Sequence, residues 1–202
     1  MLDSYQLTVH TLTLRQLASA EQLAEINAQE VSDVEANLEK AAADGAVVAA
    51  RGNFMISPTG RELLDAAYPE AFADIRSSDD ISKAMDDFET GVNKQVLSLT
   101  TEWQTKNVDG ESVSNDHGDP DYDNKILAKL GRVHEKTEKV LGPLVDADPL
   151  VDRFLDRIGT ALTRAEGGEN DYVSGVRVDS VHTVWFQMHE HILRLTGRER
   201  PE

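Results

Sequence analysis

Cysteine is absent from this chain of 202 residues, which excludes disulfides, thiolate metal sites and cysteine nucleophiles. Basic side chains are few: 20 Lys and Arg stand against 37 Asp and Glu, so the net charge is −17. A charge of this sign and size favours a solvated surface. It argues against binding to membrane surfaces and against binding to nucleic acids without sequence specificity.

Long apolar segments are also missing, since no run approaches the roughly 18 residues that a membrane span needs. Residues 1–6 contain no basic region followed by an apolar stretch, so we expect no signal peptide. These absences together predict a cytoplasmic protein that does not contact a membrane.

The pattern in residues 1–68 is typical of a winged helix-turn-helix domain. Amphipathic segments predict helices at about 4–17, from Ser19, and at about 30–44. Two short apolar segments, 46–50 and 54–56, predict strands on either side of a small wing at Arg51-Gly52-Asn53. The leucines of the first helix are expected to face mostly inward: Leu7, Leu12, Leu14 and Leu17.

The charge of the third predicted helix conflicts with DNA binding. DNA affinity comes largely from cations that neutralise phosphates. This helix, about 30–44, has Lys40 as its only base and offers these acids against it: Glu30, Asp33, Glu35 and Glu39. If the domain contacts DNA, the contacts are expected from polar and basic residues of this helix and the wing: Ser32, Asn37, Lys40 and Arg51.

Residues 78–200 predict a second domain, an antiparallel four-helix bundle, and the fold class is therefore mainly α. Pro69 and the polar run 76–80 mark the boundary between the domains. Amphipathic helices are expected from about 78 to 106, from Asp119-Pro120 to about 141, from Asp148-Pro149 to about 166, and from Asp179 or Ser180 to about 197. Gly142-Pro143 is expected to end the second of them, and residues 107–118 to form a polar loop.

Several imidazoles lie beside the apolar stripes of this bundle. His182 and His189 are seven residues apart and share one face of the last helix, and His134 has a similar position on an earlier helix. They are either half-buried histidines with ordinary hydrogen bonds or polar groups of a ligand pocket. His191 is expected to be solvated. Trp103 and Trp185 are more typical of a core, although their N–H groups need partners.

A second group of polar residues precedes the helix that starts after Asp119. A helix N-terminus favours anions, but Asp119 and the aspartates after it equally fit helix capping and the helix dipole. Asn115, Asp116 and His117 are not needed for capping and are therefore the better candidates for a site.

No pattern specifies a metal, a cofactor or a reaction. A spacing of seven places His182 and His189 about 10.5 Å apart along the helix, too far to share one ion easily. There is no Gly-rich phosphate loop and no nucleophile paired with a base. An enzyme with histidine as general base stays an alternative, without a signature that supports it.

Three segments of the second domain resemble a family of actinobacterial proteins: residues 101–104, residues 115–123, and residues 179–190 with the sequence DSVHTVWFQMHE. That family joins a winged-helix domain to a helical domain and is usually described as transcriptional regulators of MarR type. It is also associated with relatives of phosphoenolpyruvate-utilising phosphotransferases. The resemblance implies this architecture, and it implies that the motif positions line a site; basic residues are expected on the third helix and wing, where only Lys40 and Arg51 occur.

The first functional hypothesis is a ligand-responsive transcriptional regulator. The second is an interaction module without DNA binding, such as a subunit or regulator of a phosphotransferase. Regulators of this type usually dimerise, so a homodimer is considered, although no heptad seam indicates it. For the first hypothesis the rings of the helical domain are expected to gather around one cavity for a small-molecule effector, with these candidate residues: Trp103, Asn115, Asp116, His117, Tyr122, His134, His182, Trp185 and His189.

Overall fold

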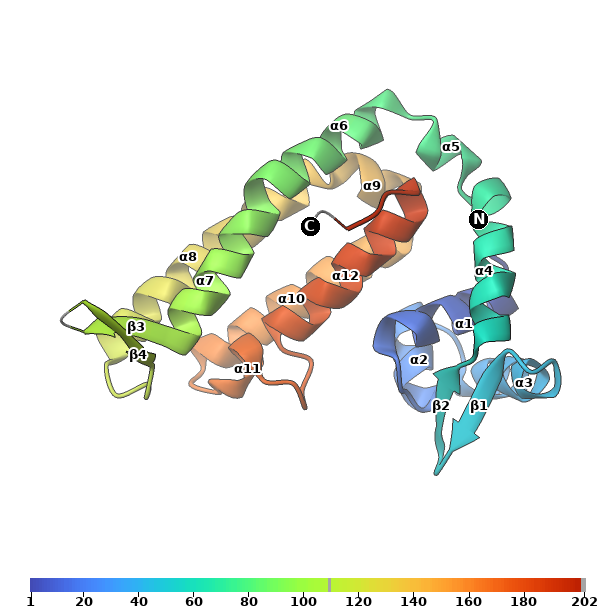
Figure 1. Ribbon diagram of the computed structural model, residues 1–202, viewed down its shortest axis with the longest axis horizontal. Coiled ribbons are helices and arrows are strands. Elements are labelled where there is room, and N and C mark those ends of the chain that lie inside the picture. Colours follow the sequence, from blue (N-terminus) through green and yellow to red (C-terminus); the bar gives the residue numbers. More distant parts are fainter. Residues whose placement is uncertain (109, 201–202) are drawn as a thin grey trace. The chain divides into compact units, whose positions relative to one another are not determined.

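A computed structural model describes residues 1–108 and 110–200, and within them the protein is mainly α-helical with two small antiparallel hairpins (Figure 1). The chain forms two compact units. The first contains Met1–Ser78 and the C-terminal segment from Glu190, and the second contains Asp79–His189. Relative to the predicted ranges 1–68 and 78–200, the first unit thus also includes the end of the last helix.

None of the helices in residues 1–108 and 110–200 has the length and apolar composition required to cross a membrane.

The helices of the first unit begin at caps that the sequence supplies. The side chains of Asp3 and Ser19 each accept a hydrogen bond from the backbone N–H three residues on, and the side chains of Gln6 and Gln22 accept one from the backbone N–H of the cap. Ser57 caps the fourth helix. The elements of the unit are α1 (Ser4–Arg15), α2 (Ala20–Asn27), α3 (Val31–Ala43), β1 (Val47–Ala50), β2 (Asn53–Ile56), α4 (Pro58–Ala71), α5 (Ala73–Arg76) and the last part of α12 (Val181–Thr196).

The predicted hairpin forms, and its turn is narrower than expected. Val47 pairs with Ile56 and Ala50 with Asn53, which leaves a two-residue turn at Arg51 and Gly52. Both turn residues have positive φ, 52° and 81°, as the type I′ turn of a two-residue hairpin requires. Helix α3 packs against α1, α2 and β1.

Two expectations for the first unit are wrong. Leu17 is 49% exposed because α1 ends at Arg15 and the chain leaves the helical register at Gln16, which has a φ of 66°. Pro69 does not mark a boundary between domains but lies inside α4. It occupies the last turn of that helix, where little of the helix remains to be disrupted.

A row of buried polar rings crosses the core of the first unit. Tyr68 Oη lies 2.8 Å from His10 Nδ1, and His10 Nε2 lies 2.9 Å from His191 Nδ1. His191 is 1% exposed, so the expectation that it is solvated is wrong. The reason is that residues from Glu190 onward belong to the first unit, where the His191 ring lies against His10.

The buried phenol of Tyr68 predicts a loss of stability at alkaline pH. Burial raises the pKa of Tyr68 to about 12, although the cation of Arg194 opposes the shift. The unfolded chain releases this proton near pH 10, so the stabilisation is complete below about pH 10 and is lost as the pH rises toward about 12. We expect the free energy of unfolding to fall by about 2 to 3 kcal/mol over this window, measured by urea denaturation. Tyr68→Phe should remove that part of the decrease, and an unchanged decrease in this variant would contradict the assignment.

The second unit begins with the long predicted helix, which contains a π-helical turn. Its three parts are α6 (Asp79–Asp87), η1 (Phe88–Val92) and α7 (Asn93–Gln104). The helices opened by Asp119-Pro120 and Asp148-Pro149 also form, with the aspartates as caps. The remaining elements are β3 (Thr105–Val108), β4 (Glu111–Ser114), α8 (Pro120–Val140), α9 (Gly142–Ala147), α10 (Pro149–Glu166), α11 (Asp171–Ser174) and the first turns of α12.

The structure corrects one further prediction in this unit and adds a short helix that was not predicted. Strands β3 and β4 pair as a hairpin where a polar loop was expected. Every residue of β4 is exposed, so the alternation of apolar and polar residues that reveals a half-buried strand is missing. Gly142-Pro143 does end α8, but proline also suits the first turn of a helix, and α9 begins there.

Helix α8 holds the second unit together by packing against both α7 and α10. Figure 1 shows α7 and α8 side by side and running in opposite directions, with the β3–β4 hairpin at the end where they connect. The largest fully buried side chains of the unit are aromatic or aliphatic: Met85, Phe88, Trp103, Ile126, Leu141, Leu144, Phe154 and Ile158.

Candidate functional site

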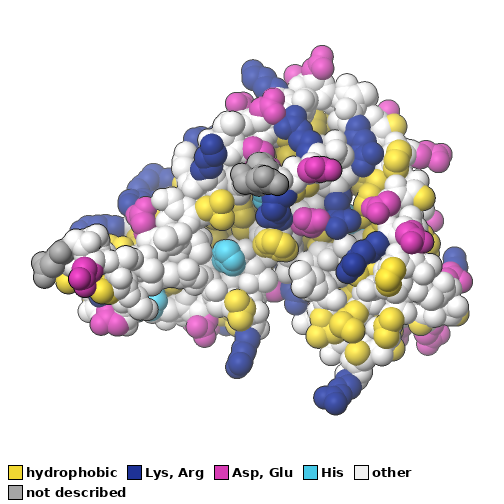
Figure 2. Space-filling view, viewed as in Figure 1, with side chains coloured by type: hydrophobic (Ala, Val, Ile, Leu, Met, Phe, Trp, Pro, Cys, Tyr) yellow, Lys and Arg dark blue, Asp and Glu magenta, His cyan; other side chains and the backbone are white. Residues whose placement is uncertain are grey.

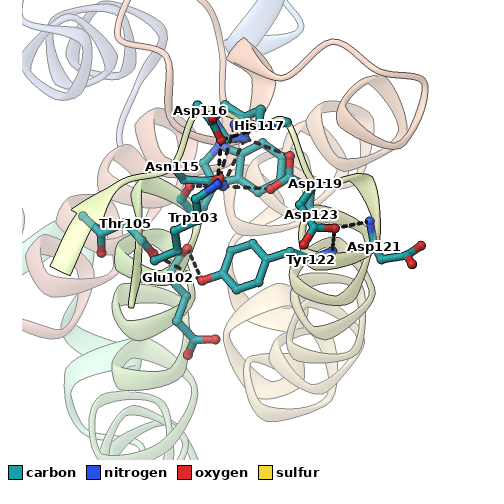
Figure 3. A network of polar contacts seen from close by, with 12 residues as sticks. Glu102, Trp103, Thr105, Asn115, Asp116, His117, Asp119, Asp121, Tyr122 and Asp123 are labelled. Carbon is teal, nitrogen blue, oxygen red and sulfur yellow. Dashed lines mark hydrogen bonds and ion pairs between the residues drawn. The ribbon is translucent and has the colours of Figure 1, made fainter. Parts of the chain in front are cut away.

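The end of α7 and the start of α8 enclose a group of polar side chains that we call the loop cluster: Trp103, Asn115, His117 and Asp123. Asn115 lies at its centre and is 6% exposed. Its amide nitrogen donates to the backbone oxygen of Trp103 at 3.0 Å and to Asp123 Oδ1 at 2.8 Å. Figure 3 shows these side chains turned toward one another. The ring centroids of His117 and Trp103 are 4.6 Å apart.

The hydrogen bonds determine which nitrogen of His117 carries the proton. Both N–H groups of the Asn115 amide are used by Trp103 and Asp123. A carboxylate only accepts hydrogen bonds, so His117 Nδ1 must donate to Asp123 Oδ2, which lies 2.9 Å away. The neutral ring is then left with an unprotonated Nε2. This nitrogen has no hydrogen-bond partner in the described part of the chain, and the His117 side chain is 27% exposed.

The backbone of His117 is also held in an unusual conformation. Its φ is 56°, in the left-handed region that residues other than glycine rarely adopt. The N–H of His117 donates to Asn115 Oδ1 at 3.2 Å, which closes a tight turn around the residue. Such a conformation costs on the order of 1 to 3 kcal/mol and persists where surrounding contacts fix it. Asn115 and Asp123 supply those contacts.

Asp116 joins the loop to strand β3. Its carboxylate lies 2.6 Å from Lys106 Nζ and is exposed. The hydrogen bond from the Lys106 ammonium lowers the pKa of Asp116, and the same bond raises the pKa of Lys106. Because the pair is solvated, it fixes the position of the loop more than it adds stability.

Tyr122 has a structural role in this arrangement. Its hydroxyl lies 2.9 Å from the backbone oxygen of Glu102 and 3.2 Å from that of Thr105, so it ties the start of α8 to the last turn of α7. Asp119 accepts hydrogen bonds from two backbone N–H groups at the start of α8 and is therefore used as the cap.

A second cluster surrounds the π-helical turn η1, and we call it the π-turn cluster: Phe88, Glu89, Asn93, Trp185 and His189. Glu89 Oε1 lies 2.6 Å from His189 Nε2, and Asn93 donates to Glu89 Oε2 at 3.0 Å. The indole N–H of Trp185 donates to Asn93 Oδ1 at 3.0 Å. Phe88 stacks on Trp185. The polar atoms of this cluster are largely used by one another, and its side chains are largely buried.

The other two predicted histidines belong to neither cluster. His134 Nε2 lies 3.5 Å from Glu138, and Gly159 of α10 leaves room for its ring, since a Cβ there would come within 3.2 Å of Nε2. His134 Nδ1 is buried without a hydrogen-bond partner in residues 1–108 and 110–200. His182 is half-buried in the first turn of α12.

The rings therefore do not surround one cavity. The loop cluster and the π-turn cluster lie at opposite ends of α7, and the ten residues from Asn93 to Trp103 correspond to about 15 Å of helix. Some of the predicted residues contact one another within each cluster, but the predicted gathering around one common cavity is not found among the described residues. Among the described residues, no group of three or more His, Asp or Glu side chains is placed to hold a metal ion.

The candidate DNA contacts of the first unit differ in their availability. Ser32 is exposed on α3. The Asn37 amide is used inside the unit, because it lies 3.0 Å from Ser4 Oγ and 3.1 Å from Thr8 Oγ1 of α1. Lys40 Nζ lies 4.4 Å from the centre of the Tyr5 ring.

The wing and α3 expose charged side chains of both signs. Arg51 is exposed in the hairpin turn. Asp33, Glu35 and Glu39 are all exposed on α3, so the acidic character expected from the sequence lies at the surface. Figure 2 shows that acidic and basic side chains are interspersed over the face in view.

The structure also contains a groove that the sequence prediction missed. It lies between α7 and α8, has a volume of about 400 Å³, and none of the nine predicted ligand residues lines it. Its basic side chains, Lys129, Arg132 and Lys136, are spaced by three and four residues. Residues with this spacing lie on one face of a helix, so they form a basic stripe on an otherwise acidic chain. This pattern could have indicated the groove from the sequence.

Comparisons with known proteins give no indication of function, so the proposals below depend on the sequence and the geometry. No family model matches the chain, and no curated protein or solved structure matches it significantly.

Proposed function

We propose that this chain is a ligand-responsive regulatory protein in which the first unit is a winged helix-turn-helix module that binds DNA and the second unit binds a small effector. The observation that carries the proposal is the order of elements in the first unit. Helices α1, α2 and α3 are followed by the β1–β2 hairpin and α4 within one compact body. In a winged helix, α3 is the recognition helix and the hairpin is the wing, with Arg51 at its tip.

The loop cluster is the proposed effector site. The His117 side chain is partly exposed and offers Nε2 as a hydrogen-bond acceptor, and its orientation is fixed by buried Asn115 and Asp123. A rigid polar group beside an indole is suited to orient a small molecule that carries a hydroxyl or amine donor. In this proposal Trp103 packs against the imidazole and does not contact the ligand with its own N–H.

DNA binding by this surface should be weak and should depend only moderately on salt. Each neutralised phosphate contributes about −0.9 to the slope of log K against log salt concentration. Lys40 and Arg51 are the two candidate cations, so we expect a slope of about −2 for DNA from upstream of the protein's own gene. An electrophoretic shift titrated with salt measures it. Absence of any salt-dependent complex at low ionic strength would remove DNA binding from the proposal.

A basic protein is the second candidate partner, and the acidic surface of α3 favours it. Asp33, Glu35 and Glu39 are exposed and suit a complementary cationic patch. The partner would then be an enzyme or regulator that this module binds, and the sequence resemblance suggests a phosphotransferase.

Charge reversal separates the two partners. The double variant Glu35→Lys with Glu39→Lys should raise DNA affinity at least 10-fold if α3 faces phosphates. If α3 faces a basic protein, the same variant should lose that protein during purification from native lysate, while the unmodified chain retains it. The matched control is reversal of two acids elsewhere, Asp152→Lys with Asp156→Lys on α10, which should change neither result.

A further inference from the structure

The groove between α7 and α8 has the composition of a binding site for an anion. Its apolar part is supplied by the buried side chains of Leu99 and Val133. A volume of about 400 Å³ is within the range of small-molecule sites. The polar lining residues come from the facing sides of the two helices: Gln95, Ser98 and Glu102 on α7, and Lys129, Arg132 and Lys136 on α8.

The positive charge of the groove contrasts with the rest of the molecule. Three cations and one carboxylate line it, whereas the whole chain has a net charge of −17. At physiological ionic strength the Debye length is about 8 Å, so distant acids are screened while cations in contact with a ligand are not. The groove is therefore a local site for an anion on an acidic protein.

The cations of the groove differ in their availability. Lys129 Nζ lies 2.9 Å from Glu102 Oε2, and both side chains are nearly half exposed. Arg132 and Lys136 are exposed and form no ion pair within residues 1–108 and 110–200. Arg132 and Lys136 are thus available to a ligand, whereas Lys129 is held by a weak, solvated ion pair with Glu102.

The spacing of the cations indicates how many anionic groups the ligand carries. Lys129 and Lys136 are two helical turns apart, about 10.5 Å along α8, with Arg132 between them. Arginine binds phosphate or carboxylate with two parallel hydrogen bonds, and lysine acts as a point charge. One anionic group fits between Lys129 and Arg132, and a second fits between Arg132 and Lys136.

We propose that this groove binds a small metabolite that carries two anionic groups, phosphate or carboxylate, about one to two helical turns apart. Ser98 and Gln95 supply hydrogen-bond donors on the opposite wall, and Leu99 with Val133 contacts the carbon skeleton. Glu102 competes with the ligand for Lys129. This site is separate from the loop cluster and does not depend on DNA binding by the first unit.

Calorimetric titration of the full chain at 0.15 M salt tests the proposal, with a hexose 1,6-bisphosphate as the probe with two anionic groups and inorganic phosphate as the probe with one. We expect the bisphosphate to bind at least 10-fold more tightly than phosphate. The variant Arg132→Gln with Lys136→Gln should weaken bisphosphate binding at least 10-fold. Both side chains are exposed, so the variant should fold, and circular dichroism checks this.

Two further variants distinguish the groove from general charge attraction. Lys125→Gln with Lys139→Gln removes two charges from the same face of α8. Neither residue lines the groove, so this variant should change the affinity less than 2-fold. Glu102→Gln frees Lys129 and should strengthen binding about 3-fold or more. Equal weakening by both double variants, or no bisphosphate binding by the unmodified chain, would overturn the proposal.

Discussion

Replacing Glu89 with alanine is expected to destabilise the second unit by about 3 to 5 kcal/mol, because it removes one partner from a buried, hydrogen-bonded pair. The carboxylate lies 2.6 Å from His189 Nε2 and also accepts from the Asn93 amide. Its loss removes the acceptor that Glu89 provides to the His189 and Asn93 donors. Urea denaturation followed by the fluorescence of Trp185, which donates to Asn93, measures the effect.

Two other variants show whether the effect comes from the pair. Glu89→Gln keeps an acceptor for one of the donors and should cost less than Glu89→Ala. Glu135 on α8 is exposed, and Glu135→Ala should change the stability by less than about 0.5 kcal/mol. Equal losses in Glu89→Ala and Glu135→Ala would show that the π-turn cluster contributes nothing to stability.

The second large effect is expected at Asn115. Asn115→Ala removes the acceptor for the His117 N–H and the donor to Asp123 Oδ1 and the Trp103 carbonyl. Leaving such groups unpaired in a buried site costs about 2 to 4 kcal/mol in total. We also expect faster hydrogen exchange in the β3–β4 hairpin, because Asn115 directly follows β4 and is bonded to the end of α7.

The matched control for this prediction is Asn124→Ala. Asn124 is exposed on the first turns of α8, so its removal should leave both the stability and the exchange of the hairpin almost unchanged. If Asn115→Ala behaves like Asn124→Ala, then Asn115 does not organise the loop cluster.

Much of the helical fold could be predicted because the relevant signals are local. Ser19, Asp119 and Asp148 are helix caps with side-chain hydrogen bonds, and proline after aspartate fixes where α8 and α10 begin. The turn at Arg51-Gly52 follows from the steric freedom of glycine and the short strands around it.

Features that depend on contacts distant in the sequence could not be predicted. The π-helical turn at Phe88–Val92 keeps the amphipathic pattern of a continuous helix, so its sequence signal is hidden. His191 looks solvated when α12 is considered alone, but it is covered because the end of α12 packs in the first unit. All four residues of strand β4 are exposed, so the strand has no buried apolar face.

The sequence indicated part of the loop cluster and missed its orienting carboxylate. Asn115 and His117 stood out because helix capping does not need them. Asp123 was interpreted as matching the helix dipole, although it lies one turn before Ile126 and Leu127 and so on the buried face of α8. A charged residue at an apolar position of a helix was the available signal.

The effector site proposed for the second unit depends on Asp123 and Asn115 holding His117 so that its accepting nitrogen, Nε2, is left without a hydrogen-bond partner among the described residues. Nuclear magnetic resonance of the ¹⁵N-labelled imidazole, at about pH 8.5 where histidine is ordinarily neutral, reports the tautomer directly. The hydrogen bonds predict a proton on Nδ1 and none on Nε2. A proton on Nε2 with Nδ1 unprotonated would contradict the orientation of the ring and remove His117 as the effector-binding group.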